Sequence, residues 1–94
     1  METKYQVTYR SEVARDDLPR IDAFWLDAIQ KAIEEKLMSR PEVYGKPLRQ
    51  SLTGFRTLRV GDYRVVFQIH KTVVRVIAIL HRSSEYKGLE KRMQ

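Results

Sequence analysis

The sequence predicts a single α+β domain in which helices cover one face of a sheet. Two periodicities support this prediction. Apolar residues recur at steps of three and four over residues 21–37, and at every second position over much of residues 55–81. The 94-residue chain has 43% hydrophobic residues. Because a chain of this size normally carries one core, we expect one domain over residues 1–94.

The first half of the chain is expected to form a strand and two helices. Residues 4–10 alternate apolar and polar side chains, which is typical of a half-buried strand. A short helix is expected over residues 12–18. Pro19 suits the first turn of a longer helix, because a proline there loses no hydrogen bond. The apolar stripe of that helix includes Trp25, which is either a core residue or an aromatic that docks a partner.

The second half is expected to form an antiparallel meander after a loop. Residues 40–54 contain two prolines and two glycines, so we expect a loop with one helical turn at most. The last strand has apolar residues on both faces and is expected to be the central one. The predicted order is β-α-α-β-β-β, with an antiparallel sheet covered on one face by two helices and a short C-terminal helix. The predicted meander strands are residues 55–60, 63–70 and 72–81.

The composition narrows the environment and the partners. There is no cysteine, so neither a disulfide framework nor a thiolate metal site is possible. No stretch has the apolar length of a signal peptide or a membrane span, and we expect a cytoplasmic protein. Eighteen Lys and Arg against twelve Asp and Glu give a net charge of +6. Such a balance favours a polyanion, an acidic partner protein or an anionic surface.

A pair of arginines on the predicted hairpin needs an explanation. If Gly61 and Asp62 form a two-residue turn, Arg59 lies directly opposite Arg64 on the face away from the helices. Like charges in that arrangement are destabilising. Either an anion such as a phosphate lies between the two guanidinium groups, or a carboxylate such as Asp62 or Glu85 neutralises them.

Further polar groups follow the last strand. His81 and Arg82 end it, and Tyr86 and Lys87 come a few residues later. An imidazole, a guanidinium and a phenol beside the arginine pair are suited to positioning a phosphodiester and transferring a proton. His70 and His81 lack the spacing of a metal site, and no nucleotide-binding glycine motif is present, so the sequence predicts neither a metal nor another cofactor.

The chain resembles the RelE/ParE toxin superfamily of type II toxin-antitoxin modules, and its RelE-type branch in particular. The resemblance covers nearly the whole chain and is carried by YGKPLRQSLTGFRTLRVGDYRVVFQI (residues 44–69) and VIAILHRSSEYK (residues 76–87). It implies a RelE-like microbial RNase fold and a metal-free endoribonuclease that cuts mRNA in the ribosomal A site and so blocks translation. It also implies a cognate antitoxin that forms a hetero-oligomer with the toxin.

The resemblance also implies roles for individual residues. Arg64, Arg82 and Tyr86 match the family's catalytic positions. Arg64 would bind phosphate, Arg82 would stabilise charge, and Tyr86 would act as the base or position it. His81 is an alternative acid or base. Further basic residues are expected to contact RNA: Lys46, Arg49, Arg56, Arg59 and Lys87.

Two other functions remain open at this point. A ParE-like toxin shares the fold and inhibits DNA gyrase without cutting RNA. A basic sheet could instead bind RNA without cleaving it, which predicts a strong salt dependence and no products. The chain also departs from the RelE pattern at Thr57, which lies between Arg56 and Arg59 where some RelE-type members carry lysines on that strand.

Overall fold

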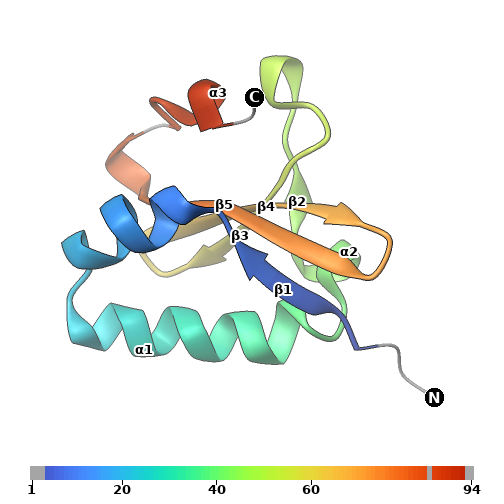
Figure 1. Ribbon diagram of the computed structural model, residues 1–94, viewed down its shortest axis with the longest axis horizontal. Helices are drawn as coiled ribbons and strands as arrows, with labels where there is room; N and C mark the ends of the chain where they lie inside the picture. The colour runs from blue at the N-terminus through green and yellow to red at the C-terminus, as the bar shows by residue number, and fades with distance from the viewer. Residues whose placement is uncertain (1–3, 85, 93–94) are drawn as a thin grey trace.

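The computed structural model describes residues 4–84 and 86–92 and confirms the α+β class. Five strands form one sheet in the order β1-β5-β4-β3-β2 (Figure 1). The strands are β1 (Gln6–Tyr9), β2 (Lys46–Pro47), β3 (Arg56–Val60), β4 (Tyr63–His70) and β5 (Val73–His81). The helical elements are η1 (Val13–Asp17), η2 (Leu18–Arg20), α1 (Ala23–Ala32), η3 (Ile33–Leu37), α2 (Pro41–Tyr44), η4 (Gln50–Leu52), η5 (Arg82–Ser84) and α3 (Leu89–Arg92).

The sheet is mixed, because β1 runs parallel to β5 with Gln6 opposite Val73. The helices carry the chain to the far edge, where β2 begins, and the meander then returns strand by strand to β1 (Figure 1). The prediction of an antiparallel sheet is therefore wrong for β1. The last strand is internal, as its apolar faces require, but β4 and not β5 is the middle strand. Local sequence patterns do not predict that β1 pairs with β5, because the two strands are far apart in the chain.

The long helix begins later than the sequence predicts. Pro19 lies in the separate short turn η2, and α1 starts at Ala23. The carboxylate of Asp22 accepts a hydrogen bond from the backbone N–H of Trp25 at 3.1 Å, which satisfies a free donor at the helix start. The helical path continues through η3 to Leu37 and ends before Pro41, as predicted.

The meander has the predicted register. Gly61 and Asp62 form the turn between β3 and β4, and Arg59 lies opposite Arg64. The β4–β5 pairing shifts between Val66 and Phe67, whose partners are Ala78 and Val76. Ile77 is thus an extra residue in β5, a bulge that places both Ile77 and Ala78 in the same apolar cluster.

The predicted loop contains more structure than expected. Residues 40–54 include the turn α2, the two-residue strand β2 and the turn η4. In β2, Lys46 lies opposite Thr57 of β3, so β2 forms the second edge of the sheet. Within the part of the chain that the structure describes, every helix is too short or too polar to cross a bilayer.

The two faces of the sheet carry separate apolar clusters. On the helix-covered face, Val65 and Phe67 of β4 pack with residues of η1, α1 and η3. On the opposite face, here called the open face, a smaller cluster is covered only by α3 and the residues around η4 (Figure 1). The buried members of the open-face cluster are Phe55, Val66, Ile77, Ala78 and Leu89.

Candidate active site

The residues with the strongest chemical potential line one small pocket. It lies where β4 begins and β5 ends, because Tyr63 is opposite His81 and Arg64 is opposite Leu80. Its volume is about 70 Å³. We call it the arginine pocket, and its lining residues are Arg64, Leu80, His81, Arg82, Ser84 and Tyr86. The structure therefore brings together all four residues that the sequence analysis placed in catalysis.

Arg64 is held by the hairpin turn beside it. Its Nη1 donates hydrogen bonds to the carbonyl oxygens of Gly61, at 3.0 Å, and of Tyr63, at 2.9 Å. Gly61 has a φ of +57°, and a Cβ atom there would collide with the ring of Trp25. Only glycine fits under that ring. Trp25 is thus a packing residue of the helix-covered core that also fixes the turn to which Arg64 is bound.

Arg82 is fixed by the same turn. Its backbone N–H donates to the carbonyl oxygen of Asp62 at 2.8 Å, and its Nε lies 3.5 Å from the Asp62 carboxylate. Among the described residues, no acidic side chain forms an ion pair with Arg59 or Arg64. The Asp62 carboxylate forms its ion pair with Arg82 and not with Arg59 or Arg64. Glu85, the other predicted partner of these arginines, lies outside the described residues.

His81 has a defined proton arrangement. The backbone N–H of Ser83 donates to its Nδ1 at 3.2 Å, and the Ser83 hydroxyl lies 2.8 Å from the same nitrogen. Because an amide N–H can only donate, Nδ1 is an acceptor and the neutral ring carries its proton on Nε2. The Tyr63 ring packs against the imidazole edge to face at 5.3 Å. His81 can therefore offer an N–H toward a ligand.

Tyr86 occupies an unusual backbone conformation. Its φ is +63°, which a residue with a side chain adopts rarely and at a conformational cost. The tyrosine is half-buried, and its side chain packs against the open-face cluster. Such outliers concentrate at functional sites, where the surrounding structure enforces them.

Ser84 was not singled out from the sequence. Its hydroxyl is buried and has no hydrogen-bond partner among the described residues, although it lines the arginine pocket. A buried polar atom without a partner is uncommon and favours a bound group that supplies one. A serine in a tail of mixed polar residues carries no sequence signal of this kind.

The predicted RNA-contacting residues do not all lie on the same side. Arg59 is exposed beside Arg64, and Lys46 is exposed in the neighbouring row of the open face, opposite Thr57. Arg49 is exposed just before η4, and Lys87 follows Tyr86. These four basic residues therefore surround the arginine pocket and the elements that cover the open face.

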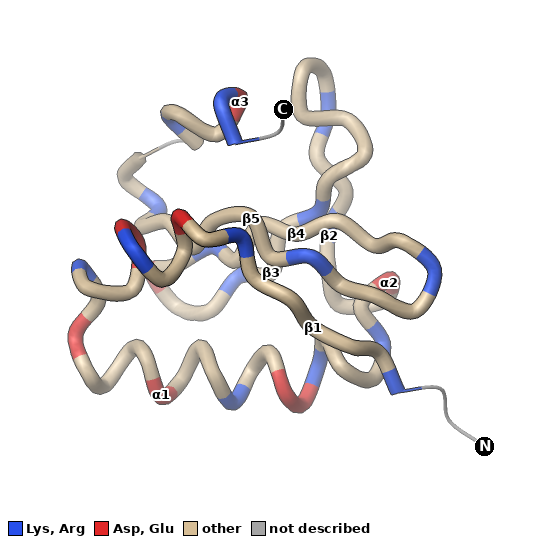
Figure 2. Tube along the Cα trace, in the orientation of Figure 1, with Lys and Arg blue, Asp and Glu red and all other residues tan. Residues whose placement is uncertain are grey.

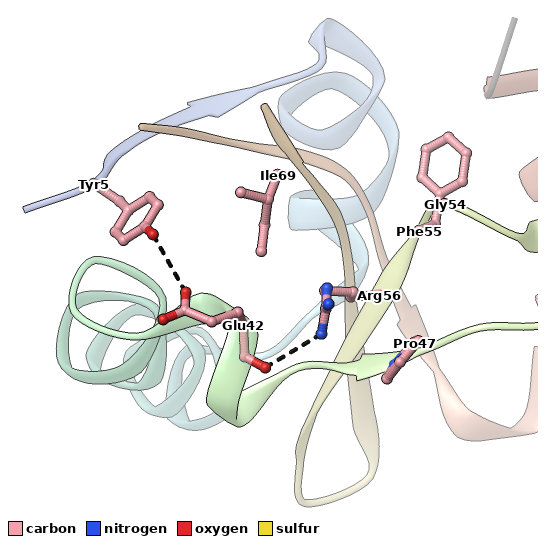
Figure 3. A pocket seen from close by; sticks show the side chains of 7 residues that line it. All are labelled: Tyr5, Glu42, Pro47, Gly54, Phe55, Arg56 and Ile69. Carbon is pink, nitrogen blue, oxygen red and sulfur yellow. Dashed lines mark hydrogen bonds between the residues drawn. The ribbon is translucent and has the colours of Figure 1, made fainter. Parts of the chain in front are cut away.

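Arg56 lies elsewhere. Its Nη1 donates to the carbonyl oxygens of Gly45, at 3.0 Å, and Glu42, at 3.3 Å, so it ties α2 to β3. Figure 3 shows its side chain in a different pocket, of about 430 Å³, together with Tyr5 and Ile69. Because its side chain lines that pocket and not the arginine pocket, we leave Arg56 out of the proposed site.

Charges are distributed unevenly over the molecule. Figure 2 shows acidic residues mainly in η1, α1 and η3, whereas basic residues lie along the strands, before η4 and in α3. Within residues 4–84 and 86–92, no group of three or more His, Asp or Glu side chains could hold a metal ion. The chemistry available in the arginine pocket is therefore that of guanidinium, imidazole, hydroxyl and phenol groups.

Comparison with known proteins agrees with this geometry. Residues 9–86 match the family model of the ParE toxin of the type II toxin-antitoxin system parDE. The chain is 37% identical to Toxin RelE of Mycobacterium tuberculosis over 87 residues, which cover 88% of this chain and 87% of that protein. The chain belongs to the RelE/ParE toxin family.

Solved structures of the family share its fold. The toxin-antitoxin complex RelBE2 of M. tuberculosis contains a chain that matches with a TM-score of 0.79 and 30% identity, over 86% of this chain and 94% of that one. YafQ of Escherichia coli matches with a TM-score of 0.60 and 17% identity, over 88% of this chain and 99% of that one, which shows the fold alone. The present RelE/ParE-family toxin is thus a RelE-type toxin in sequence and in architecture.

The C-terminal segment of this RelE/ParE-family toxin is anchored by a buried ion pair. β1 ends at Tyr9, opposite Val76, so the following part of β5 has no strand on that side. Asp17 accepts from the N–H of Ile79 at 2.9 Å, and Arg92 donates to the carbonyl oxygen of Ile77 at 3.2 Å.

The same two side chains also bind each other. Asp17, which is only 5% exposed, accepts from both terminal nitrogens of Arg92, at 2.6 and 2.9 Å. These hydrogen bonds raise the pKa of the Arg92 guanidinium further above its usual value. Because α3 follows Tyr86 closely, the Asp17–Arg92 pair holds the segment that carries Tyr86 on the open face.

Proposed function

We propose that this toxin is an endoribonuclease that cleaves mRNA on the ribosome, in the A site, and thereby stops translation in the cytoplasm. The observation that carries the proposal is the convergence of Arg64, His81, Arg82 and Tyr86 on one pocket at the exposed end of the sheet. The relatives named above support the toxin class. The ribosome and the A site rest on the resemblance and on the arginine pocket.

The pocket offers a group for each task in RNA cleavage. The 2′-OH must lose its proton as its oxygen attacks phosphorus, the charged phosphorane must be stabilised, and the leaving 5′-oxygen must gain a proton. In our scheme Arg64 binds the phosphate and Arg82 stabilises the charge that develops on it. Tyr86 accepts the 2′-OH proton or positions the group that does.

Arg59 and His81 complete this scheme. A phosphate between Arg59 and Arg64 would relieve the repulsion of two cations that face each other across the strands. His81 directs a hydrogen bond from its Nε2–H to the leaving 5′-oxygen, and water supplies the proton that this oxygen gains, because the neutral ring that accepts from Ser83 at Nδ1 does not act as an acid. The buried Ser84 hydroxyl, which has no hydrogen-bond partner among the described residues, gains one from the bound RNA.

We also propose an antitoxin as the partner in a toxin-antitoxin hetero-oligomer. The similar RelBE2 toxin was solved as a toxin-antitoxin complex. This chain exposes 72% of Phe24 of α1, beside Trp25, and it exposes basic residues elsewhere, including Arg59 and Arg75 on the open face. Such a combination suits an acidic, partly disordered segment that folds as it binds.

One observation favours a second function. The matching family model is that of ParE, and ParE-like toxins would inhibit gyrase instead of cutting RNA. Purified toxin should be added to a cell-free translation reaction, with primer-extension mapping of the mRNA and ribosome-free RNA as the control. Cuts in codon register that require ribosomes support the proposal. Intact mRNA combined with loss of DNA supercoiling by gyrase would replace it with the ParE-like function.

A non-catalytic RNA-binding module gives a third outcome in the same reaction. It leaves mRNA and supercoiling unchanged and binds RNA with an affinity that falls steeply with salt. Each of the three functions therefore has its own result.

A further inference from the structure

A second pocket adjoins the arginine pocket. Tyr86 lines both, so the two share a wall. The second has a volume of about 440 Å³, within the size range of pockets that bind small molecules. It lies between the segment of η4 and the C-terminal segment, which stand next to each other in Figure 1. We call it the lysine pocket, and its polar side chains come from Ser51, Tyr86, Lys87, Glu90 and Lys91.

The lysine pocket has the composition of a nucleotide site. Lys87 and Lys91 supply positive charge for a phosphate, and both are exposed. Leu52 and the ring of Tyr86 supply apolar surface for a base. Gly88 has a φ of +77°, and a Cβ atom there would meet no atom within 4 Å, so the wall formed by the backbone is open.

Glu90 is an unexpected residue in such a place. Its carboxylate would repel a phosphate, so it does not belong to a site for phosphate alone. The Ser51 hydroxyl donates to its Oε1 at 3.0 Å and restricts its orientation. Its other carboxylate oxygen has no hydrogen bond to a described residue. A carboxylate accepts hydrogen bonds only, and it therefore favours a ligand that presents N–H or O–H donors.

We propose that the lysine pocket binds the nucleotide next to the cleaved phosphate and that Glu90 selects a base with an exocyclic amino group. Cytosine, adenine and guanine each carry such a group, and a carboxylate accepts from it, as from N4 of cytosine. Uracil has none, and the carbonyl oxygens that flank its N3–H would face the carboxylate. The expected order therefore places uridine last. This inference rests on the proposed ribonuclease function for its position next to the cleaved phosphate.

A binding experiment tests the pocket without requiring catalysis. CMP and UMP are a matched pair, because they differ only at N3 and position 4 of the base. Each is titrated into the full-length protein, and the backbone amide signals of Leu52, Gly88 and Lys91 are followed by NMR. We expect CMP to bind about tenfold more tightly than UMP, the discrimination typical of a good base-edge contact. Glu90→Gln should remove the difference, because an amide both donates and accepts.

Matched variants separate this effect from a general change of charge. Glu35→Gln makes the same change in η3, on the helix-covered side of the sheet. It should leave the CMP preference intact. Lys91→Ala should weaken both nucleotides about threefold, and Lys31→Ala in α1 should weaken neither. Equal binding of CMP and UMP, or a preference that survives Glu90→Gln, overturns base selection. Signals that do not move at any of the three amides overturn the pocket itself.

A cleavage assay then tests the position of the nucleotide. Ribosome-bound mRNAs that differ only in the base flanking the cut are compared with wild-type protein and Glu90→Gln. We expect uridine to be cut about tenfold less efficiently by the wild type, and the difference to vanish in the variant. If the wild type cuts no RNA while CMP still binds selectively, the proposed function fails and the pocket stands. If cutting is normal and independent of the flanking base, the inference fails and the function stands.

Discussion

The two faces of the sheet differ in what their residues contribute. On the helix-covered face, Val65, Phe67, Val74 and Val76 are fully buried and pack with apolar residues of the helices. On the open face a smaller apolar cluster is bordered by cations, including the directly opposed Arg59 and Arg64. Since those two cations repel each other, the open face gives up stability that the other face supplies. The comparison teaches that most folding free energy lies on the helix-covered face, whereas the arginine pair lies on the opposite side of the same strands.

The largest expected effect is a loss of stability when the helix-covered core is disrupted. Phe67 is fully buried at the centre of the helix-covered core, and its ring also lies against Gly45. Phe67→Ala should lower the free energy of unfolding by about 3–5 kcal/mol, through lost burial and the cavity that remains. Urea unfolding followed by circular dichroism measures it. A loss under about 1 kcal/mol would contradict the assignment of stability to this face.

The next effect concerns the ion pair that joins the two faces. Arg92→Met leaves the buried Asp17 carboxylate without its cation and should cost about 3 kcal/mol. Adding Asp17→Asn removes the stranded charge and should restore part of this loss. Arg15→Met is the matched control, because the Arg15–Asp16 pair is exposed and such pairs contribute about 0–1 kcal/mol.

Urea unfolding of all the ion-pair variants measures how much the Asp17–Arg92 pair contributes to stability. If Arg92→Met and Arg15→Met destabilise equally, the C-terminal segment is not anchored as described.

The smallest effect has the opposite sign. Arg59→Ala removes one of two facing cations and should raise the free energy of unfolding by a few tenths of a kcal/mol to about 1 kcal/mol. It should also reduce the salt dependence of RNA binding by about one unit of slope, because one phosphate contact is lost. Destabilisation together with an unchanged salt slope would mean that Arg59 serves the fold and not the ligand.

The sequence predicts this hairpin well and the rest of the fold less completely. Gly61 and Asp62 define a two-residue turn, and the turn fixes which residues face each other, so the Arg59–Arg64 pair follows from local rules. The parallel pairing of β1 with β5 and the Asp17–Arg92 pair join the two ends of the chain. No local pattern encodes such contacts. The start of α1 was missed because Asp22 caps the helix while Pro19 lies within a separate turn.

In the candidate site, too, the sequence predicts the residues that local patterns identify and misses those that depend on contacts between distant segments. Arg64 was singled out by the hairpin register, and His81, Arg82 and Tyr86 by their chemistry after the last strand. The resemblance of whole segments to a family then implied catalytic roles for Arg64, Arg82 and Tyr86. Ser84 and Glu90 were missed, because their importance depends on a buried hydroxyl and on a contact with Ser51 across the open face. Arg56 was predicted to contact RNA, and strand alternation does not reveal that its side chain would bond the backbone of Gly45.

The most direct test of the central claim compares two arginines on the open face. Arg64 lies in the arginine pocket, whereas Arg75 is exposed toward the other end, opposite Gln68. Each is changed to alanine, and the single-turnover rate of mRNA cleavage on purified ribosomes is measured with the protein in excess.

We expect Arg64→Ala to lower the rate about 100-fold or more, as loss of a group that stabilises the transition state does. Arg75→Ala should change it by less than about threefold, since it removes the same charge far from the reacting phosphate. Equal rates for the two variants would contradict a catalytic site at the arginine pocket.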